Sequence, residues 1–239
     1  MNLCIDIGNT RTKIGLFENH KPGQVLVFEN DKPFRLEGKI PFDKIENCII
    51  SSTILIDAGF LDQLQSIRKL ITLDENTKLP FKNLYETPRT LGKDRLALVA
   101  AAVSLHPAKN VLVIGCGTCI TFNFKNAAEE FTGGSIHPGL KMRLQAMHTF
   151  TGKLPLIPLE KAGHWMAAST GGSLLTGAVY GAAKEIDGMI AEYVKNYEDL
   201  TVLITGGDSE MLGNMLKNEI FALPDLTLIG LNKILLSNV

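Results

Sequence analysis

The chain has 239 residues, 45% of them hydrophobic, and its 24 basic and 25 acidic residues leave a net charge of -1. This length and composition allow a sizeable core, in one large domain or two smaller ones. The balanced charge, with no dense stripe of Lys and Arg, argues against a nucleic-acid partner. No stretch reaches about 18 consecutive apolar residues, and the first residues lack a signal-peptide pattern. We therefore expect a soluble, intracellular protein without a membrane partner.

The first half of the chain alternates strand-like runs with helical patterns. Apolar runs bounded by turn residues predict strands at residues 3–7, 13–17, 24–28 and 48–51. A helical pattern around residues 60–67 and a short strand around residues 70–73 follow. A helix is predicted over residues 93–105, with Leu96, Val99, Ala100 and Val103 on one face, and His106-Pro107 ends it.

The same order of elements restarts at Asn110. The patterns predict strands at residues 111–114, 119–124 and 130–136, helices at 139–149 and 172–194, a strand at 201–205, a helix from 209 and a terminal segment at 226–236. The repetition is one of structure, not of sequence. It predicts an α/β fold of two similar domains, residues 1–107 and 108–239, facing one another across a ligand-binding cleft.

The segment D-I-G-N-T-R-T-K, Asp6 to Lys13, places a carboxylate and a tight turn at the exit of the first strand. Gly8 lets the backbone approach a ligand closely, and Lys13 adds a cation where the next strand begins. The segment indicates a β-hairpin whose tip suits a phosphate and its metal ion. It is neither a Walker A loop nor a dinucleotide fingerprint, because a strand follows the turn. An ordinary polar hairpin is the alternative interpretation.

Two further glycine-bearing turns lie in the second half. The run I-G-C-G-T-C-I-T from Ile114 to Thr121 repeats the pattern of the first hairpin, and two facing turns of this kind would clamp a triphosphate. T-G-G-D at residues 205–208 follows a strand and precedes a helix, where glycines admit a base or a ribose. The alternative for T-G-G-D is a turn that needs glycine for backbone reasons alone.

A carboxylate and a guanidinium, Asp94 and Arg95, lie side by side at the start of the predicted helix 93–105. Such a pair would serve as general base and anion clamp. The alternative is an ordinary capping aspartate beside a solvated arginine. Further on, G-G-S-I-H-P-G-L at residues 133–140 ends a strand and starts a helix, and its His137 either lines a site or is solvated.

The four cysteines form no complete redox or metal motif. Cys116 and Cys119 make a C-x-x-C pair, but they flank a predicted strand-turn-strand, whereas a redox pair usually opens a helix. No second pair or H-x-x-x-H completes a zinc site. We expect structural or incidental thiols, and the absence of a disulfide framework predicts a cytoplasmic protein.

Glycine-bearing turns in duplicated α/β halves are characteristic of the acetate and sugar kinase, Hsp70 and actin superfamily. Taken in order, D-I-G-N-T-x-x-K, G-K-D-R, G-T-x-x-T, G-G-x-I-x-P-G-L, S-T-G-G-S and T-G-G resemble the type III pantothenate kinase family over nearly the whole chain. The resemblance implies two duplicated actin-like (ribonuclease H-like) domains. It also implies ATP-dependent phosphorylation of pantothenate to 4'-phosphopantothenate, the first step of coenzyme A biosynthesis.

The resemblance assigns roles to individual residues. Asp94 would take the proton from the substrate hydroxyl, and Arg95 would hold the pantothenate carboxylate. The residues implied to hold ATP and Mg²⁺, with Asp6 as the metal ligand, are Asp6, Ile7, Gly8, Asn9, Thr10, Arg11, Thr12, Lys13, Thr118, Gly206 and Gly207. Those implied to bind pantothenate are Gly92, Lys93, Asp94, Arg95 and Thr170. Tyr85 is a further candidate to pack on pantothenate, although a core or surface position explains it equally well.

Two positions depart from the family pattern. The family usually carries Asp where this chain has Gly115, and often where it has Asn123, and the first of these helps to bind an activating monovalent cation. The loss of hard anionic oxygens puts the K⁺ or NH₄⁺ site in doubt.

The family is dimeric, and the helix at residues 172–194 is a candidate interface. Its small residues Gly177, Ala178, Gly181, Ala182 and Ala183 would permit close helix packing, although packing within one subunit is equally compatible. Two other functions stay open. One is a catalytically weak nucleotide-binding regulator or accessory protein of the same fold, and the other is a kinase that acts on a sugar or small acid.

Overall fold

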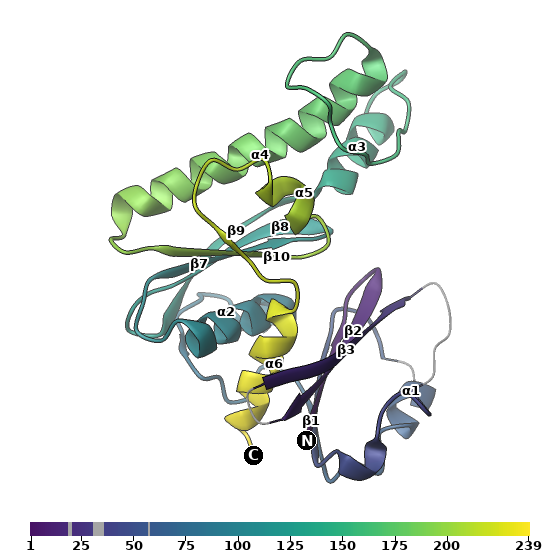
Figure 1. The fold of residues 1–239 in the computed structure, drawn as a ribbon, viewed down its shortest axis with the longest axis vertical. Coiled ribbons are helices and arrows are strands. Elements are labelled where there is room, and N and C mark those ends of the chain that lie inside the picture. Colours follow the sequence, from purple (N-terminus) through teal and green to yellow (C-terminus); the bar gives the residue numbers. More distant parts are fainter. Residues whose placement is uncertain (19–20, 31–35, 57) are drawn as a thin grey trace. The chain divides into compact units, whose positions relative to one another are not determined.

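The computed structural model describes residues 1–18, 21–30, 36–56 and 58–239 (Figure 1). Contacts divide the chain into two compact units. The first unit comprises Met1–Ala108, Ala128–Thr132 and Asp225–Val239, and the second comprises Lys109–Ala127 and Gly133–Pro224. Each unit has its own clusters of buried apolar side chains.

The sheet of the first unit has the strand order β3-β2-β1-β4-β5. β2 is antiparallel to β1 and β3, whereas β4 is parallel to β1 and β5 is parallel to β4. These strands are β1 (Asn2–Ile7), β2 (Arg11–Glu18), β3 (Lys21–Glu29), β4 (Asn47–Ser52) and β5 (Lys69–Thr72). β1 and β4 are central and buried on both faces, so their sequences read as nearly continuous apolar runs. All five predicted strands are confirmed.

Two helices, α2 (Lys93–Leu105) and α6 (Leu226–Leu236), lie side by side in the first unit (Figure 1). They approach so closely that a Cβ added to Gly230 would lie 1.7 Å from the carbonyl oxygen of Ala97. The predicted bounds of α2 are confirmed, but the helix is buried on all sides and not only on the predicted apolar face. Every residue from Arg95 to Val103 is buried, and one reason is that α6 packs against this helix.

The second unit repeats the strand order of the first. β7 is antiparallel to β8, β10 is parallel to β7 and β11 is parallel to β10. The strand order of this sheet is β11-β10-β7-β8-β9-β6, where β6 (Lys82–Asn83) pairs with the first residues of β9, Glu130 and Phe131, which belong to the first unit. The strands are β7 (Val111–Cys116), β8 (Cys119–Lys125), β9 (Glu130–Pro138), β10 (Thr201–Thr205) and β11 (Phe221–Ala222). The expected structural repetition between the two halves is confirmed.

The helix α4 (Thr170–Asn196) covers one face of this second sheet, and α3 (Leu140–Thr149) packs against α4 (Figure 1). Small side chains on the inner side of α4, Ala182 and Ala183, are completely buried in the same cluster as Phe122 and Phe124 of β8. These small residues therefore let the helix lie close to its own sheet.

Several short elements carry too little pattern to be read from sequence. The helix expected at residues 60–67 is wrong in its extent, because α1 spans only Ala58–Asp62 and residues 63–67 form turns and a bend. The helix predicted from residue 209 is confirmed, and it is short, spanning Ser209–Gly213 (α5). Short 3₁₀ helices at Phe42–Lys44 and Pro88–Thr90 and the two-residue strand β6 (Lys82–Asn83) were not expected.

The division of the chain at its C-terminus differs from the predicted domains 1–107 and 108–239. Contacts group Asp225–Val239 with the first unit, because α6 buries Leu228, Leu231 and Ile234 in the cluster that also contains α2. The terminal helix thus completes the first core, not the second. Within the described ranges, no helix combines the length and apolarity needed to cross a membrane.

Candidate active site

Asp6 lies at the exit of β1, one residue before that strand ends. In the sheet it is paired with Lys13 of β2 on one side and with Ser51 of β4 on the other. The predicted hairpin at residues 6–13 is therefore confirmed as a structural element. It presents one carboxylate in the middle of three adjacent strands.

The surroundings of Asp6 raise the pKa of its carboxyl from 3.8 to about 6. Burial is the largest cause and the negative charge of Asp94 is the next, while Ser51 and Lys13 lower the pKa and so offset part of the rise. The hydroxyl of Ser51 lies close enough to Asp6 to lower the pKa of that carboxyl. Ser51 Oγ nevertheless makes no hydrogen bond of normal geometry with any described residue. Two carboxylates from distant parts of the sequence thus interact electrostatically in the first unit.

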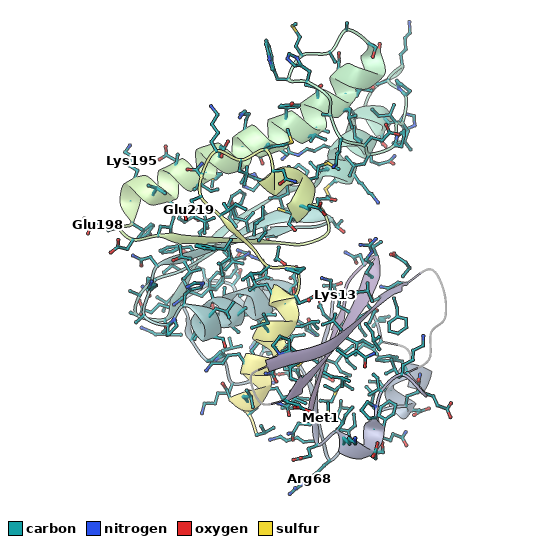
Figure 2. The ribbon with its side chains drawn as sticks, viewed as in Figure 1. Met1, Lys13, Arg68, Lys195, Glu198 and Glu219 are labelled. Atoms are coloured by element: carbon teal, nitrogen blue, oxygen red, sulfur yellow. The ribbon has the colours of Figure 1, made fainter. Side chains whose placement is uncertain are left out.

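Lys13 makes a second contact that the sequence did not indicate. Its Nζ lies 3.5 Å from Oδ1 of Asp225, the residue that precedes α6. Figure 2 labels Lys13 on β2, near the first turn of that helix. Both side chains are roughly one-third exposed, so Lys13 is held by a partly exposed ion pair within reach of Asp6.

Asn30 closes the turn of the first hairpin. Its Nδ2 donates to the carbonyl of Gly8 at 2.7 Å, its Oδ1 accepts from the hydroxyl of Thr12 at 2.7 Å, and its backbone N–H donates to Thr10 at 2.9 Å. Thr12 is therefore buried and its hydroxyl is already engaged.

The remaining members of this hairpin divide between core and surface. Asn9 and Thr10 are exposed at the tip, where a ligand has access to them. Ile7 is buried in an apolar cluster, and Arg11 is paired with Glu29 at 2.7 Å. The side chains of Ile7 and Thr12 therefore stabilise the fold around the hairpin and do not point to a ligand.

The start of α2 carries Gly92, Lys93 and Asp94. Gly92 is the N-cap and has no side chain to cap the helix, and Asp94 is the second helical residue. The alternative of Asp94 as an ordinary capping residue is therefore wrong. A Cβ added to Gly92 would lie 2.5 Å from Oδ1 of Asp94, so the carboxylate of Asp94 folds back over a position that only glycine leaves free.

Arg95 is buried, with 3% of its surface exposed, and the alternative of a solvated arginine is wrong. Its guanidinium carbon lies 5.4 Å from the ring centre of Tyr85 and 5.7 Å from that of Phe131. Tyr85 itself is half-buried and packs against an apolar cluster. Tyr85 and Arg95, both expected at the substrate site, thus lie together in the first unit.

In the second unit, the glycine-bearing β7–β8 hairpin is contacted by two other glycine motifs, the loop before α3 and the T-G-G-D turn. Thr118 is exposed at its tip, and its carbonyl accepts a hydrogen bond from the N–H of Gly139 at 3.1 Å. A Cβ on Gly139 would lie 2.4 Å from that carbonyl oxygen. The loop before α3 therefore supports the tip that presents Thr118.

The T-G-G-D turn meets the same hairpin. Gly206 has φ of +107°, and a Cβ there would lie 2.2 Å from the carbonyl oxygen of Cys116. The N–H of Asp208 donates to that carbonyl at 3.1 Å. The positive φ and the close carbonyl are sufficient reasons for a glycine at position 206. The next residue, Gly207, is exposed.

A chain of polar contacts anchors the loop that supports Thr118. Glu185 of α4 accepts from Nη2 of Arg143 at 2.8 and 2.9 Å and lies 2.6 Å from Nδ1 of His137, whose Nε2 is 2.7 Å from Oγ of Ser135. Nε of Arg143 also donates to the carbonyl of Pro138 at 2.9 Å. His137 is therefore a half-buried structural contact and is not free in solvent.

Thr170 is the first residue of α4, and the preceding Ser169 caps the helix by accepting from the N–H of Gly172 at 3.2 Å. Thr170 is exposed. It lines an open cavity of about 520 Å³ in the second unit, and the other lining residues are Met147, Leu154, Ala167, Ala168, Ser169, Ser173 and Leu174.

The positions that depart from the family pattern lie inside the second sheet. Gly115 pairs with Thr121 and Thr205 on its two sides. Asn123 is completely buried, and its Nδ2 donates to the carbonyl of Val113 and to Thr121, each at 3.2 Å. Across the residues that the structure describes, no three His, Cys, Asp or Glu side chains form a cluster able to hold a metal ion.

All four cysteines are free thiols. Cys116 ends β7 and Cys119 begins β8, as the strand-turn-strand prediction required. Burial raises the pKa of Cys116 to about 12 and raises the pKa values of Cys4 and Cys48 as well. These three thiols are therefore poor nucleophiles near neutral pH.

The chain matches known proteins along nearly its whole length. The model of the type III pantothenate kinase family matches residues 2–192. The type III pantothenate kinase of Christiangramia forsetii is 45% identical over 239 residues, with 98% of each chain covered. That of Bacteroides fragilis is 42% identical, covering 98% of this chain and 97% of the other.

Solved structures agree with the fold. A conserved Campylobacter jejuni protein assigned to the Baf family has a TM-score of 0.62 at 20% identity, with 99% and 98% of the two chains covered. Component A of (R)-2-hydroxyglutaryl-CoA dehydratase from Acidaminococcus fermentans has a TM-score of 0.52 at 11% identity, with 99% and 96% covered. These likenesses and the repeated strand order of the two units agree with the predicted α/β fold of two duplicated domains. On the strength of the family model and these relatives, the chain belongs to the type III pantothenate kinase family.

Proposed function

We propose that this chain transfers the γ-phosphoryl group of ATP to the primary hydroxyl of pantothenate, making 4'-phosphopantothenate in the first step of coenzyme A biosynthesis. The observation that carries the proposal is the pair Asp6 and Asp94. These carboxylates come from the end of β1 and the start of α2, yet Asp94 is close enough to raise the pKa of Asp6. The relatives that match over full length are named for this activity.

On the donor side, Gly8, Asn9, Thr10 and Lys13 hold the phosphates. Thr118 contributes from the second hairpin, and Gly206 and Gly207 lie against the adenosine. The exposed tip of the first hairpin supports this assignment, as does the gathering of the second unit's glycine turns around Thr118.

Asp6 fits a Mg²⁺ ligand. A carboxylate that is largely buried beside a second carboxylate is costly to ionise, and a divalent cation offsets that cost. Mg²⁺ is usually held by one or two carboxylates together with substrate phosphates and water, so it does not need a cluster of three side chains. When bound, it would neutralise charge on the phosphates during transfer.

On the acceptor side, Asp94 accepts the proton of the primary hydroxyl as that oxygen attacks the γ-phosphorus. The bond between the γ-phosphorus and the bridging oxygen breaks, and ADP leaves. Arg95 holds the carboxylate of pantothenate and Thr170 contacts the substrate. Positioning and charge stabilisation supply most of the rate in such a transfer.

The oligomer, the cellular location and the cation requirement are part of the same proposal. Homodimerisation through α4 is supported by Gly177 and Gly181, which are exposed and have no atom of the described residues within 4 Å of an added Cβ. A cytoplasmic location suits a chain whose cysteines stay reduced. With Gly115 in place of a carboxylate, the K⁺ or NH₄⁺ site is weakened or built from backbone carbonyls.

The proposal is tested by assaying ADP release from Mg-ATP with pantothenate, in K⁺, NH₄⁺ and Na⁺ separately, with mass spectrometry of the product. We expect one 4'-phosphopantothenate per ADP. No turnover in any of the three salts would favour the nucleotide-binding regulator, for which the named relatives give no support. Turnover with a sugar or another small acid but not with pantothenate would favour a different kinase.

A further inference from the structure

Two aromatic rings lie close to the guanidinium of Arg95. Arg95 is almost completely buried, and both Tyr85 and Phe131 lie within 6 Å of its guanidinium carbon. Burial of a cation is costly unless its surroundings compensate. The faces of aromatic rings attract a cation, and they do so more strongly when water is excluded.

The two rings form one rigid support. Tyr85 and Phe131 are stacked, with ring centres 5.9 Å apart and planes 9° from parallel. Phe81 meets Phe131 edge-on at 6.3 Å. Because Phe131 is completely buried in this cluster, its ring has little freedom to turn, and the position of Tyr85 is coupled to it.

A short parallel strand pair within the first unit fixes this support. Asn83 of β6 is in register with Phe131 at the start of β9, and the N–H of Leu84 donates to the carbonyl of Phe131 at 3.0 Å. The side-chain oxygen of Asn83 accepts from the N–H of Tyr85 at 3.1 Å. The two-residue strand that sequence analysis overlooked thus brings together two rings that lie 46 positions apart in the chain.

We propose that Phe131 is a positioning residue for substrate recognition. Together with Tyr85 it holds the guanidinium of Arg95 in the orientation that pairs with the carboxylate of the acceptor, and so favours acidic acceptors over neutral ones. This inference rests on the proposed function. In it, Tyr85 acts through Arg95 and does not need to lie on pantothenate itself.

The matched pair Phe131→Leu and Phe81→Leu tests the proposal. Each removes one ring from the same apolar cluster and keeps a similar apolar volume, but only Phe131 faces the guanidinium. For Phe131→Leu we expect a KM for pantothenate about tenfold higher, with kcat and the KM for ATP within about twofold of the parent. The preference for pantothenate over its neutral alcohol analogue, pantothenol, should fall about tenfold. Phe81→Leu should leave the preference unchanged.

Nuclear magnetic resonance of the Nε–Hε group of Arg95, assigned by its loss in Arg95→Lys, gives a readout that needs no turnover. Ring currents should shift this signal in the parent and in Phe81→Leu, and the shift should be reduced in Phe131→Leu. Equal kinetic effects of the two leucine variants, or an Arg95 signal unmoved by Phe131→Leu, would overturn the inference. If the parent fails to phosphorylate pantothenate, the proposed function is lost, and the Arg95 signal still decides whether Phe131 holds the guanidinium.

Discussion

Replacing Gly92 by alanine tests whether the carboxylate of Asp94 must occupy its observed position. The added Cβ would lie 2.5 Å from Oδ1 of Asp94, whereas ordinary contacts begin near 3.4 Å. Oδ1 must therefore retreat by about 0.9 Å. The backbone itself tolerates alanine, because φ and ψ of Gly92 are -58° and 133°.

A displacement of about 1 Å in a catalytic group costs about a hundredfold in rate. We therefore expect Gly92→Ala to lower kcat by about that factor, equivalent to about 2.7 kcal/mol, and to leave the KM for ATP within about twofold. Loss of the glycine N-cap should cost about 1 kcal/mol of stability, which thermal unfolding would measure.

The control is the same substitution in an Asp94→Asn background. If Gly92 acts through the carboxylate, Gly92→Ala should add little to the loss already caused by Asp94→Asn, so the two changes are strongly non-additive. A kcat within twofold of the parent would refute this reasoning. So would a hundredfold loss that is fully retained in the Asp94→Asn background.

Three further predictions follow from the surroundings of individual residues. Because Asp6 has a folded pKa of about 6 against an ordinary 3.8, the folded state binds its proton more tightly, and ionisation costs stability as pH rises through this window. At about 1.4 kcal/mol per pKa unit, metal-free Asp6→Asn should gain at most about 3 kcal/mol in free energy of unfolding at pH 8 and nothing below about pH 4. The exposed control Asp43→Asn should show no such pH-dependent gain. An equal gain of Asp6→Asn at both pH values would contradict this prediction. Glu185→Gln should weaken the contacts that hold the loop before α3 against Thr118, and so lower Tm and raise the KM for ATP several-fold. The exposed control Glu192→Gln, on the same helix, should change neither quantity. Identical behaviour of the two variants would show that Glu185 does not hold this loop. Gly115→Asp should strengthen the dependence of kcat on K⁺, since it restores a hard anionic ligand, and an unchanged cation response would remove the missing carboxylate as the cause.

Local pattern was sufficient for most of the fold. The strands around Asp6 and the hairpin at Thr118 follow from short apolar runs bounded by glycine, and the bounds of α2 follow from its apolar run and the proline after His106. The burial of α2 on all sides did not follow, because the covering helix α6 is far along the chain. Periodicity within one helix carries no information about a partner so distant.

The candidate site divides in the same way. The resemblance named Asp6, Asp94 and Arg95, and within the first unit the negative charge of Asp94 raises the pKa of Asp6. Asp225 and Phe131 were missed because their contacts depend on a terminal helix and on a two-residue strand pair. Both contacts join residues far apart in the sequence, so local patterns could not reveal them.

The most direct test of the account is steady-state kinetics of Asp94→Asn with Mg-ATP and pantothenate, alongside calorimetric binding of the nucleotide. The substitution keeps the shape of the side chain and removes its ability to accept the substrate's proton. We predict that kcat falls by at least about a thousandfold while the Kd for Mg-ATP stays within about threefold. Full activity of Asp94→Asn would contradict the assignment of Asp94 as the base on which the proposed mechanism depends.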